Sequence, residues 1–356
     1  MLKTEVTISD EDRSKRKRYF AATIITCVAF LALGIAIHLI GMLDKGMATM
    51  KSKATYDLAE MDLHIRAAGE DVFLHQKHEA GKLEHEKYAL SEVSELISPV
   101  QWKELDSMIT IPEGEFKMGT NHRLADPQNR PEHVVTLPAY QISKYPVTNV
   151  QYAKFVANND YRPPSSWRNG KINQSELLHP VTLVSWYDGN NYCESIGGRL
   201  PTEAEWEKAA RGTDGRRWPW GNKMDAKRLN TYYNMGSTTD VTMFPAGVSP
   251  YGVMDMAGNV SEWTQDSFYK YEGSDASDDI FKGKIGAVTN PQDKALKVVD
   301  LIEVNAEYKV LRGGSWKSDP FSTSSYHRNF SFPHYASDFY GFRCAKDVAA
   351  GKENTR

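Results

Sequence analysis

The stretch Tyr251–Asp266 (YGVMDMAGNVSEWTQD) constrains the fold of this chain more than any other segment. It is short, and its apolar residues follow neither a helical nor a strand period. Gly252 and Gly258 permit backbone angles that other residues resist, while Asn259 and Glu262 supply side-chain oxygens. We therefore expect an irregular core segment that is held by side-chain hydrogen bonds or by an ion.

Other parts of the chain share this turn-rich character and are expected to belong to the same folded body. After Gly212 most of the sequence consists of glycine- and proline-containing turn signals and short irregular segments. A hydrophobic content of 40% and eight tryptophans suit a globular core. The related stretches are Tyr145–Tyr152 (YPVTNVQY), His179–Tyr192 (HPVTLVSWYDGNNY), Arg199–Arg211 (RLPTEAEWEKAAR) and Arg312–Trp316 (RGGSW).

Local signals predict three helices within this body. Thr148 with Gln151 and Thr202 with Glu205 have the spacing of capping boxes. Ser185 is a plausible N-cap. The predicted helices end near Val156, Gly197-Gly198 and Arg211, and the predicted strands are a pair within Ser107–Gly119, one strand over His133–Ile142 and one over Leu301–Leu311.

The net charge of −3 and a pI near 6.4 give no global basic field, so we predict no nucleic-acid partner. Charge is concentrated instead at the N-terminus, where residues 1–18 end in a basic cluster. Phe20–Leu43 then runs without Asp, Glu, Lys or Arg. As a helix it would be roughly 36 Å long, which is enough to cross a bilayer.

The basic flank predicts a cytoplasmic tail over 1–18 and a transmembrane signal anchor over 19–43, with the rest of the chain outside the cytoplasm. A signal peptide is the alternative, although no small-residue cleavage pattern follows. We expect a single-pass protein of a bacterial inner membrane, with its C-terminal domain in the periplasm. An endoplasmic-reticulum membrane would have the same topology.

Residues 44–101 are charged and mostly helix-forming, and predict a helical stalk that could self-associate. His75, His78 and His85 fall on one face of such a helix. One interpretation is a metal or haem site. The other, which we favour, is a solvated face among lysines and glutamates.

Eight motifs along residues 105–347 resemble, in family order, the formylglycine-generating enzyme (sulfatase-modifying factor) family, which includes ergothioneine- and pyoverdine-biosynthesis relatives. The resemblance implies an irregular α+β, C-type-lectin-like fold over 102–347. The terminal residues 348–356 are expected to be a disordered tail. The motifs are MGT (118–120), YPVTNVQYAKFV (145–156), HPVTLVSW (179–186), RLPTEAEWEKAARG (199–212), WPWGN (218–222), YGVMDMAGNVSEW (251–263), RGGSW (312–316) and GFRCA (341–345).

At the positions of the family's active-site cysteines, this chain differs from the formylglycine generator. The formylglycine generator oxidises a substrate cysteine with two active-site cysteines and copper. Ser318 and Thr323 stand at the matching positions of this chain. A hydroxyl cannot bind Cu(I) as a thiolate does or cycle through a disulfide, so we predict no copper at this site and no sulfatase maturation by that route.

Other family positions imply structural roles. Cys193 and Cys344 match a family disulfide, and two buried free thiols are the alternative. Asn230 and Asn259 match family positions near structural calcium sites, Asn230 less closely than Asn259, and Glu262 lies close to the second of these sites. Asn259 and Glu262 could equally satisfy buried backbone groups. The residues expected to line the family's ligand groove are Trp316, Ser318, Tyr326, His327, Arg328, His334 and Tyr335.

Within that groove, His327 is the best general base if chemistry remains, while Arg328 could instead form a buried structural ion pair. The first functional hypothesis is a binding, accessory or maturation factor for a protein or peptide partner outside the cytoplasm. The alternative is an oxidoreductase of the pyoverdine-tailoring type that acts on a small molecule or peptide. Sulfatase activation is a third and weaker interpretation.

Overall fold

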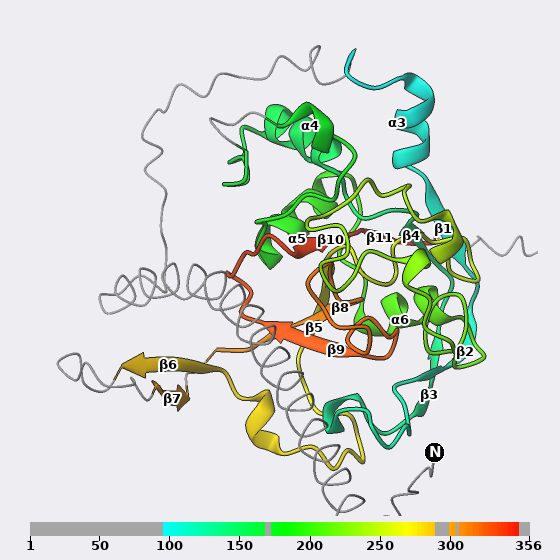
Figure 1. Cartoon of the computed structure of the whole chain (residues 1–356), viewed down its shortest axis with the longest axis vertical. Helices are drawn as coiled ribbons and strands as arrows, with labels where there is room; N and C mark the ends of the chain where they lie inside the picture. The colour runs from blue at the N-terminus through cyan, green and yellow to red at the C-terminus, as the bar shows by residue number, and fades with distance from the viewer. Residues whose placement is uncertain (1–94, 168–171, 289–298, 304–305, 349–356) are drawn as a thin grey trace, which may run out of the picture. The chain divides into compact units, whose positions relative to one another are not determined.

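The computed structural model of the chain describes residues 95–167, 172–288, 299–303 and 306–348 (Figure 1). None of the helices in those ranges is long and apolar enough to cross a membrane. The predicted tail, transmembrane helix, histidine cluster and most of the stalk lie outside the described residues, as does the C-terminal tail after residue 348.

Four α-helices begin at residues whose side chains cap them. In each, a Ser or Thr accepts a hydrogen bond from the third helical N–H, and the side chain at that third position accepts from the capping residue's own N–H. The capped starts predicted at Thr148, Ser185 and Thr202 are confirmed. The helices are α3 (Pro99–Leu105), α4 (Asn149–Asn159), α5 (Trp186–Ser195) and α6 (Glu203–Arg211).

The strands form small sheets rather than one large one. One sheet has the order β1-β4-β11 and another the order β10-β5-β8-β9, while β2-β3 and β6-β7 are two-stranded. Among these pairs β10 and β5 run parallel and the others antiparallel. The strands are β1 (Met108–Ile111), β2 (Gly114–Met118), β3 (His133–Leu137), β4 (Tyr140–Ser143), β5 (Ser261–Ser267), β6 (Lys284–Val288), β7 (Val299–Glu303), β8 (Lys309–Arg312), β9 (Arg328–Ser331), β10 (Tyr340–Phe342) and β11 (Ala345–Asp347).

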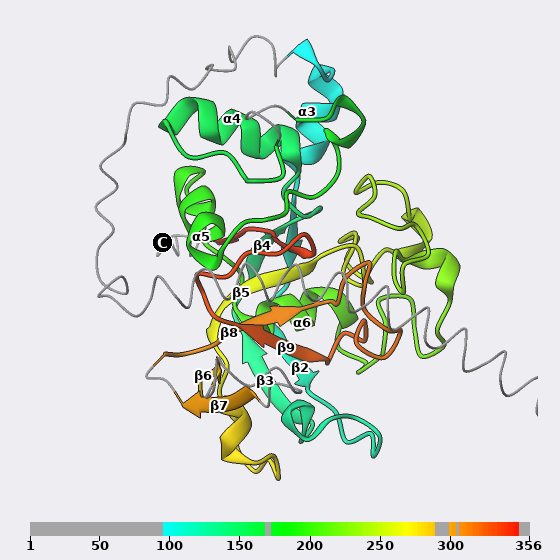
Figure 2. The ribbon, with the colours of Figure 1, turned by 60° about the vertical axis from the view of Figure 1, so that its left-hand side comes forward.

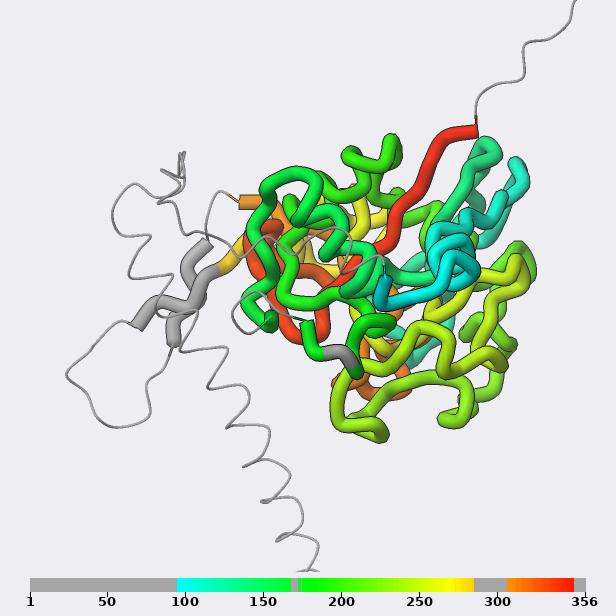
Figure 3. Tube along the Cα trace, turned by 90° about the horizontal axis from the view of Figure 1, so that it is seen from above, coloured from blue at the N-terminus to red at the C-terminus, as the bar shows by residue number. Residues whose placement is uncertain are grey.

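Between α6 and β5 the chain has little regular structure, as the sequence predicted. Residues 213–250 contain two short 3-10 helices, η3 (Ala226–Arg228) and η4 (Pro245–Gly247). Figure 3 shows this yellow-green segment gathered on one side of the described domain. Three further 3-10 helices occur elsewhere, namely η1 (Pro127–Asn129), η2 (Gln174–Glu176) and η5 (Asp278–Phe281).

Two of the predicted strand assignments were wrong, and so was the irregular assignment of the second half of Tyr251–Asp266. His133–Ile142 contains two strands in different sheets, because Pro138 lacks the N–H that a continuous ladder needs. Leu301–Leu311 likewise contains the end of β7 and the start of β8. The second half of Tyr251–Asp266 forms most of strand β5, whose first four residues are all buried and whose pairing with β8 is interrupted by a register shift. A strand covered on both faces shows no alternation of polar and apolar residues.

A buried ion pair holds the Tyr251–Asp266 segment in place. The carboxylate of Glu262 accepts hydrogen bonds at 2.6 and 2.7 Å from the guanidinium of Arg343. One of its oxygens also accepts from the indole N–H of Trp206 on α6 at 2.7 Å. Arg343 donates in addition to the carbonyl of Met254 at 2.8 Å. These bonds join β5, α6 and the end of β10 in the absence of a long sheet.

The predicted disulfide between Cys193 and Cys344 is confirmed. It joins α5 to the segment between β10 and β11, and both cysteines are fully buried. Aromatic rings pack around it: Tyr192 lies 5.8 Å from Tyr152 and 5.4 Å from Phe342, measured between ring centroids. The bond therefore crosslinks the main apolar core.

Reduction of this disulfide should destabilise the domain. In the chain-entropy model, closing a loop of this length stabilises by roughly 5 kcal/mol, and by less if the native bond is strained. We expect Cys193→Ala with Cys344→Ala, or treatment with a reductant, to lower the melting temperature of the full-length protein in detergent. A Cys27→Ala variant, which lacks the remaining cysteine, should keep its sensitivity to reductant. Equal melting temperatures with and without reductant would contradict this role.

Candidate functional site

The candidate site is the loop 313–327, which connects β8 to β9. It begins with two glycines in left-handed conformations: φ is +88° at Gly313 and +65° at Gly314. A Cβ atom on Gly313 would lie 2.9 Å from the ring of Trp206, and one on Gly314 would lie 2.7 Å from the carbonyl oxygen of Ser322. The Gly-Gly pair is therefore required both by the backbone angles and by close packing.

Residues on α6 anchor both ends of this loop. Arg312 precedes the loop and Arg328 follows it, and both guanidinium groups reach the carboxylate of Glu203, at 3.3 Å and 2.7 Å. Arg312 also pairs with Glu207. Figures 1 and 2 show α6 beside β8 and β9, which carry these arginines. Burial alone would raise the pKa of Glu203, but the two guanidinium groups hold it below its usual value.

Arg312 also fixes the course of the loop itself. Its terminal nitrogens donate to the carbonyl oxygens of Ser325 at 2.7 Å, Tyr326 at 3.1 Å and His327 at 3.0 Å. Arg328 is buried and its guanidinium lies 4.0 Å from the ring centroid of Tyr271. The alternative of a buried structural ion pair for Arg328 thus agrees with the geometry.

Ser318 and Thr323 make hydrogen bonds inside the loop. The Ser318 hydroxyl oxygen accepts from the backbone N–H of Ser315 at 2.9 Å. The Thr323 hydroxyl donates to the carbonyl of Pro320 at 2.8 Å and accepts from the indole N–H of Trp218 at 3.2 Å. Thr323 is fully buried. Both hydroxyls therefore have local partners that define the loop.

A strained turn packs against the same loop. Tyr232 and Tyr233 have φ values of +49° and +59°, which are unfavourable for aromatic residues. Their backbone N–H groups donate to the carbonyl oxygens of Ser318 at 2.9 Å and Trp316 at 2.7 Å. The ring of Tyr233 contacts that of Trp316 edge-on at 5.4 Å. These bonds hold the strained turn beside the loop and leave Tyr232 exposed.

His327 lies at the other end of the loop, and its side chain is 18% exposed. Burial and the nearby Arg312 lower its pKa to about 4, against the opposing effect of Asp126, whose carboxylate lies 3.8 Å away. Its Nδ1 is 3.5 Å from the Asn129 amide nitrogen. The imidazole is therefore neutral at pH 7, and a group with this pKa is a weak general base.

The predicted groove residues do not all lie together. Trp316 and Ser318 face the 231–233 turn, and His327 faces Asp126 and Asn129. Tyr335 contacts Phe332, and the His334 ring lies 5.7 Å from the same phenylalanine. The Tyr326 ring is 5.8 Å from the guanidinium groups of both Arg211 and Arg217.

A pocket of about 330 Å³ lies elsewhere, between α3, α4 and α5. Its walls include Trp102, Asp106, Lys154 and Tyr192. It contains none of the residues expected to line the family groove. The lysine ammonium lies 4.8 Å from the Trp102 ring centroid, and Asp106 accepts a hydrogen bond from Gln151. Lys154 and Asp106, two charged residues that line the pocket, therefore already interact with neighbouring side chains.

The predicted calcium residues differ in how well they suit an ion. Both Glu262 oxygens are engaged by Arg343, one of them also by Trp206. The Asn259 side-chain oxygen accepts from the N–H of Thr239 at 2.9 Å. Asn230, in contrast, has a buried side-chain oxygen without a hydrogen-bond partner. The Asn230 oxygen is therefore available to a cation. Asn259 satisfies a backbone group, as the alternative interpretation expects, whereas the partners of Glu262 are side chains.

Sequence reasoning missed Asp255 in this region. Its carboxylate is buried and accepts a hydrogen bond from the Asn259 amide at 2.9 Å. Burial raises its pKa to about 7. Its position four residues before Asn259, in the same motif, was the available signal. Among the described residues no group of three or more His, Cys, Asp or Glu side chains is placed to hold a metal.

Comparison with known proteins identifies the family of this domain. A family model described as a sulfatase-modifying factor enzyme 1-like domain matches residues 93–348. The chain belongs to this family. The resemblance predicted from the eight motifs is confirmed, and with it the mixed helix and sheet content of the fold.

Members of the family that resemble this chain carry different names. The serine/threonine-protein kinase pkn1 of Chlamydia pneumoniae is 35% identical over 260 residues, which cover 68% of this chain and 38% of that protein. The hercynine oxygenase of Mycobacterium tuberculosis is 31% identical over 255 residues, covering 62% of this chain and 55% of that protein. This chain thus spans only part of both curated relatives.

The solved structure of PvdO from Pseudomonas aeruginosa has the same fold. It aligns with a TM-score of 0.54 and 28% sequence identity, covering 69% of this chain and 96% of that one. This chain is therefore similar both to a hercynine oxygenase and to PvdO.

The environment of His327 predicts its titration. We expect an NMR titration of the imidazole to give a midpoint near the value of about 4, because burial disfavours the charged form. The unfolded-state histidine titrates near pH 6.5. The folded protein should therefore lose stability relative to His327→Gln as pH falls from about 6.5 to about 4, with no further difference below. A midpoint near 6.5 would contradict this environment.

Proposed function

We propose that this protein is a membrane-anchored, extracytoplasmic binding or accessory factor that holds a protein or peptide partner at the loop 313–327. The observation that carries the proposal is the state of Ser318 and Thr323. Both hydroxyls are used in hydrogen bonds that shape the loop. Neither can supply a thiolate for copper or for disulfide exchange.

The surroundings of the loop support binding over catalysis. His327 is neutral and weakly basic at pH 7. Phe321 and Tyr232, on the loop and on the adjoining turn, are each 62% exposed. Exposed aromatic side chains held on an ordered backbone are suited to contact with a partner. We propose the anchoring helix and the periplasmic location because Phe20–Leu43 is a long uncharged run that follows a basic cluster.

An oxidoreductase of the pyoverdine-tailoring type, acting on a small molecule or peptide, is the second proposal. Its support is the similarity to a hercynine oxygenase and to PvdO. Ser318→Ala, Tyr326→Phe and His327→Ala separate the two proposals. Each substitution should abolish the activity of an enzyme that uses these groups, whereas a binding factor should tolerate several of them.

Isolation of the full-length protein from its native membranes in mild detergent tests the first proposal. We expect one protein partner in a stoichiometric amount, identified by mass spectrometry. Phe321→Ala with Tyr232→Ala should release it, since these rings are the most exposed at the loop. Tyr187→Ala is the matched control, because this ring on α5 is 52% exposed away from the loop.

Two results would contradict the binding proposal. One is a stable, monodisperse protein with no partner in native membranes. The other is equal loss of the partner in the Tyr187→Ala control, which would show that the loop has no special part in binding. Either result would favour a search for a small-molecule substrate.

We also propose a structural calcium ion near Asn230. The side-chain oxygen of Asn230 is buried without a hydrogen-bond partner. Its amide nitrogen donates to Asn259, which in turn donates to the buried carboxylate of Asp255. Calcium favours such oxygen ligands, and ionised Asp255 would be the form that binds it. Calcium added after chelation should raise the melting temperature, and Asn230→Ala should remove that rise. Asp225→Asn, at an exposed ion pair, should retain it. Equal melting temperatures with calcium and with chelator would exclude the ion.

A further inference from the structure

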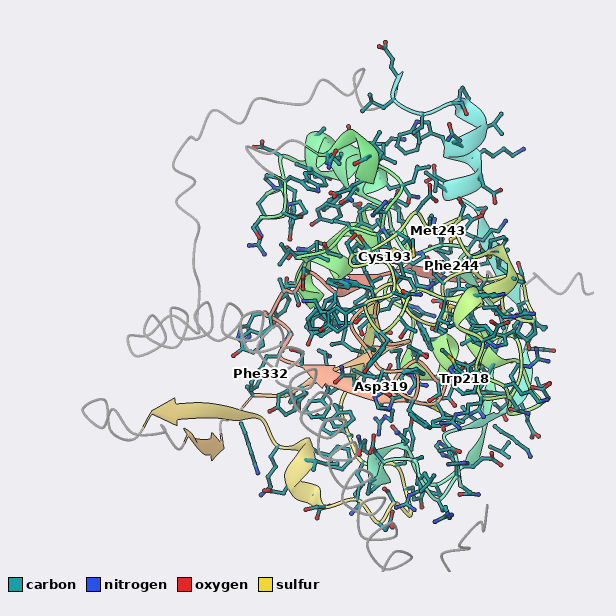
Figure 4. All side chains as sticks on the ribbon, viewed as in Figure 1. Cys193, Trp218, Met243, Phe244, Asp319 and Phe332 are labelled. Atoms are coloured by element: carbon teal, nitrogen blue, oxygen red, sulfur yellow. A yellow bond between two sulfur atoms is a disulfide. The ribbon has the colours of Figure 1, made fainter. Side chains whose placement is uncertain are left out.

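Arg217 lies beside the loop in a setting of aromatic rings. Its guanidinium carbon is 4.7 Å from the ring centroid of Trp218, 5.0 Å from that of Phe321 and 5.8 Å from that of Tyr326. Its backbone is fixed to the loop, because its carbonyl accepts from the N–H of Ser325 at 2.8 Å. Figure 4 labels Trp218, and also Asp319 of the loop 313–327. The three rings define an aromatic cradle around the cation.

The charge of Arg217 has no anionic partner among the residues that the structure describes. Its Nε is buried without a hydrogen-bond acceptor. The preceding residue is different, since Arg216 makes three hydrogen bonds to the carboxylate of Asp214, at 2.7 to 3.2 Å. Arg216 therefore has a carboxylate partner, whereas the Nε–H of the adjacent Arg217 has no acceptor among the described residues. A buried N–H group without an acceptor carries a free-energy cost.

Asp319, the one acidic residue of the loop 313–327, already has hydrogen-bond donors. Asp319 accepts hydrogen bonds from the backbone N–H groups of Phe321 and Ser322 and from the Ser322 hydroxyl, at 2.8, 3.2 and 2.6 Å. It makes no ion pair with Arg217. Within the described residues, the cradle therefore keeps a positive charge without an ion-pair partner, over the exposed Phe321 ring.

The geometry selects the class of group that this charge would bind. Rings lie against the guanidinium, and stacked guanidinium groups still present N–H donors at their edge. A carboxylate matches this planar edge with two parallel hydrogen bonds. A single cation balances the single charge of a carboxylate, and the exposed Phe321 ring offers an apolar surface to a neighbouring aromatic or aliphatic group.

We propose that Arg217 is the specificity-determining residue of the loop and binds a carboxylate, from an aspartate, a glutamate or a chain terminus, that lies next to an apolar side chain of a peptide segment. This inference rests on the proposed binding function, because it names the chemistry of the partner at the same loop. It predicts that a partner segment presents an acidic residue beside an apolar one.

A pair of peptides that differ in one group tests the inference with the full-length protein in detergent. The probes are N-acetyl-Phe-Glu-amide and N-acetyl-Phe-Gln-amide, titrated by calorimetry or by ligand-observed NMR. The protein should bind the Glu peptide about tenfold more tightly than the Gln peptide, as expected for a charge-assisted hydrogen bond. Added salt should reduce that preference.

Variants of the two arginines supply the decisive comparison. Arg217→Gln should reduce the Glu-to-Gln preference to about one, whereas Arg216→Gln should leave it near tenfold. Near-UV circular dichroism checks that both variants remain folded, and Arg217→Lys, which keeps the charge without the planar edge, should give an intermediate preference. A preference that survives Arg217→Gln, or a wild-type protein without a preference or without saturable binding, overturns the inference.

Different results would reject the carboxylate site and the proposed binding function. A native partner could be recovered while Arg217→Gln leaves its binding unchanged, which would retain the binding function and reject the carboxylate site. Absence of any partner would reject the function itself, whatever the peptides show.

Discussion

The loop of the candidate site depends on one carboxylate of α6. Glu203 receives the guanidinium groups of Arg312 and Arg328, which stand at the two ends of that loop. Glu207, one turn further along the helix, pairs with Arg312 and with Arg211. Removing one partner of a buried pair leaves an uncompensated charge and costs about 3–5 kcal/mol. The ion pairs therefore fix where the loop begins and ends.

This arrangement separates the shape of the loop from its chemistry. Arg312 donates to three consecutive loop carbonyls, and Gly313 and Gly314 pack against Trp206 and Ser322. None of these contacts requires sulfur at residues 318 or 323. A family member can therefore carry hydroxyls at these positions and keep an ordered loop.

Local sequence signals were sufficient where the stabilising contacts are local. The capping boxes at Thr148 and Thr202 involve residues three apart, so their helices could be placed in advance. The strands were harder, because pairing partners lie far away in sequence. The sequence of β5 does not predict a strand, since burial on both faces removes the alternation that marks one. His133–Ile142 contains β3 and β4 rather than one strand, because Pro138 interrupts the backbone N–H donors between them.

The sequence by itself determined the capped helices, the family motifs and the absence of cysteines at residues 318 and 323, because these follow from residue identities and short spacings. The partners of the disulfide came only from the resemblance to the family, since Cys193 and Cys344 lie 151 residues apart. Only the tertiary structure decided how charged side chains pair. Glu262 pairs with Arg343, Arg328 pairs with Glu203, and Arg217 lies against aromatic rings. The Glu262–Arg343 and Glu203–Arg328 pairs join residues 81 and 125 positions apart, and no local pattern specifies that such distant charges become neighbours once the chain is folded.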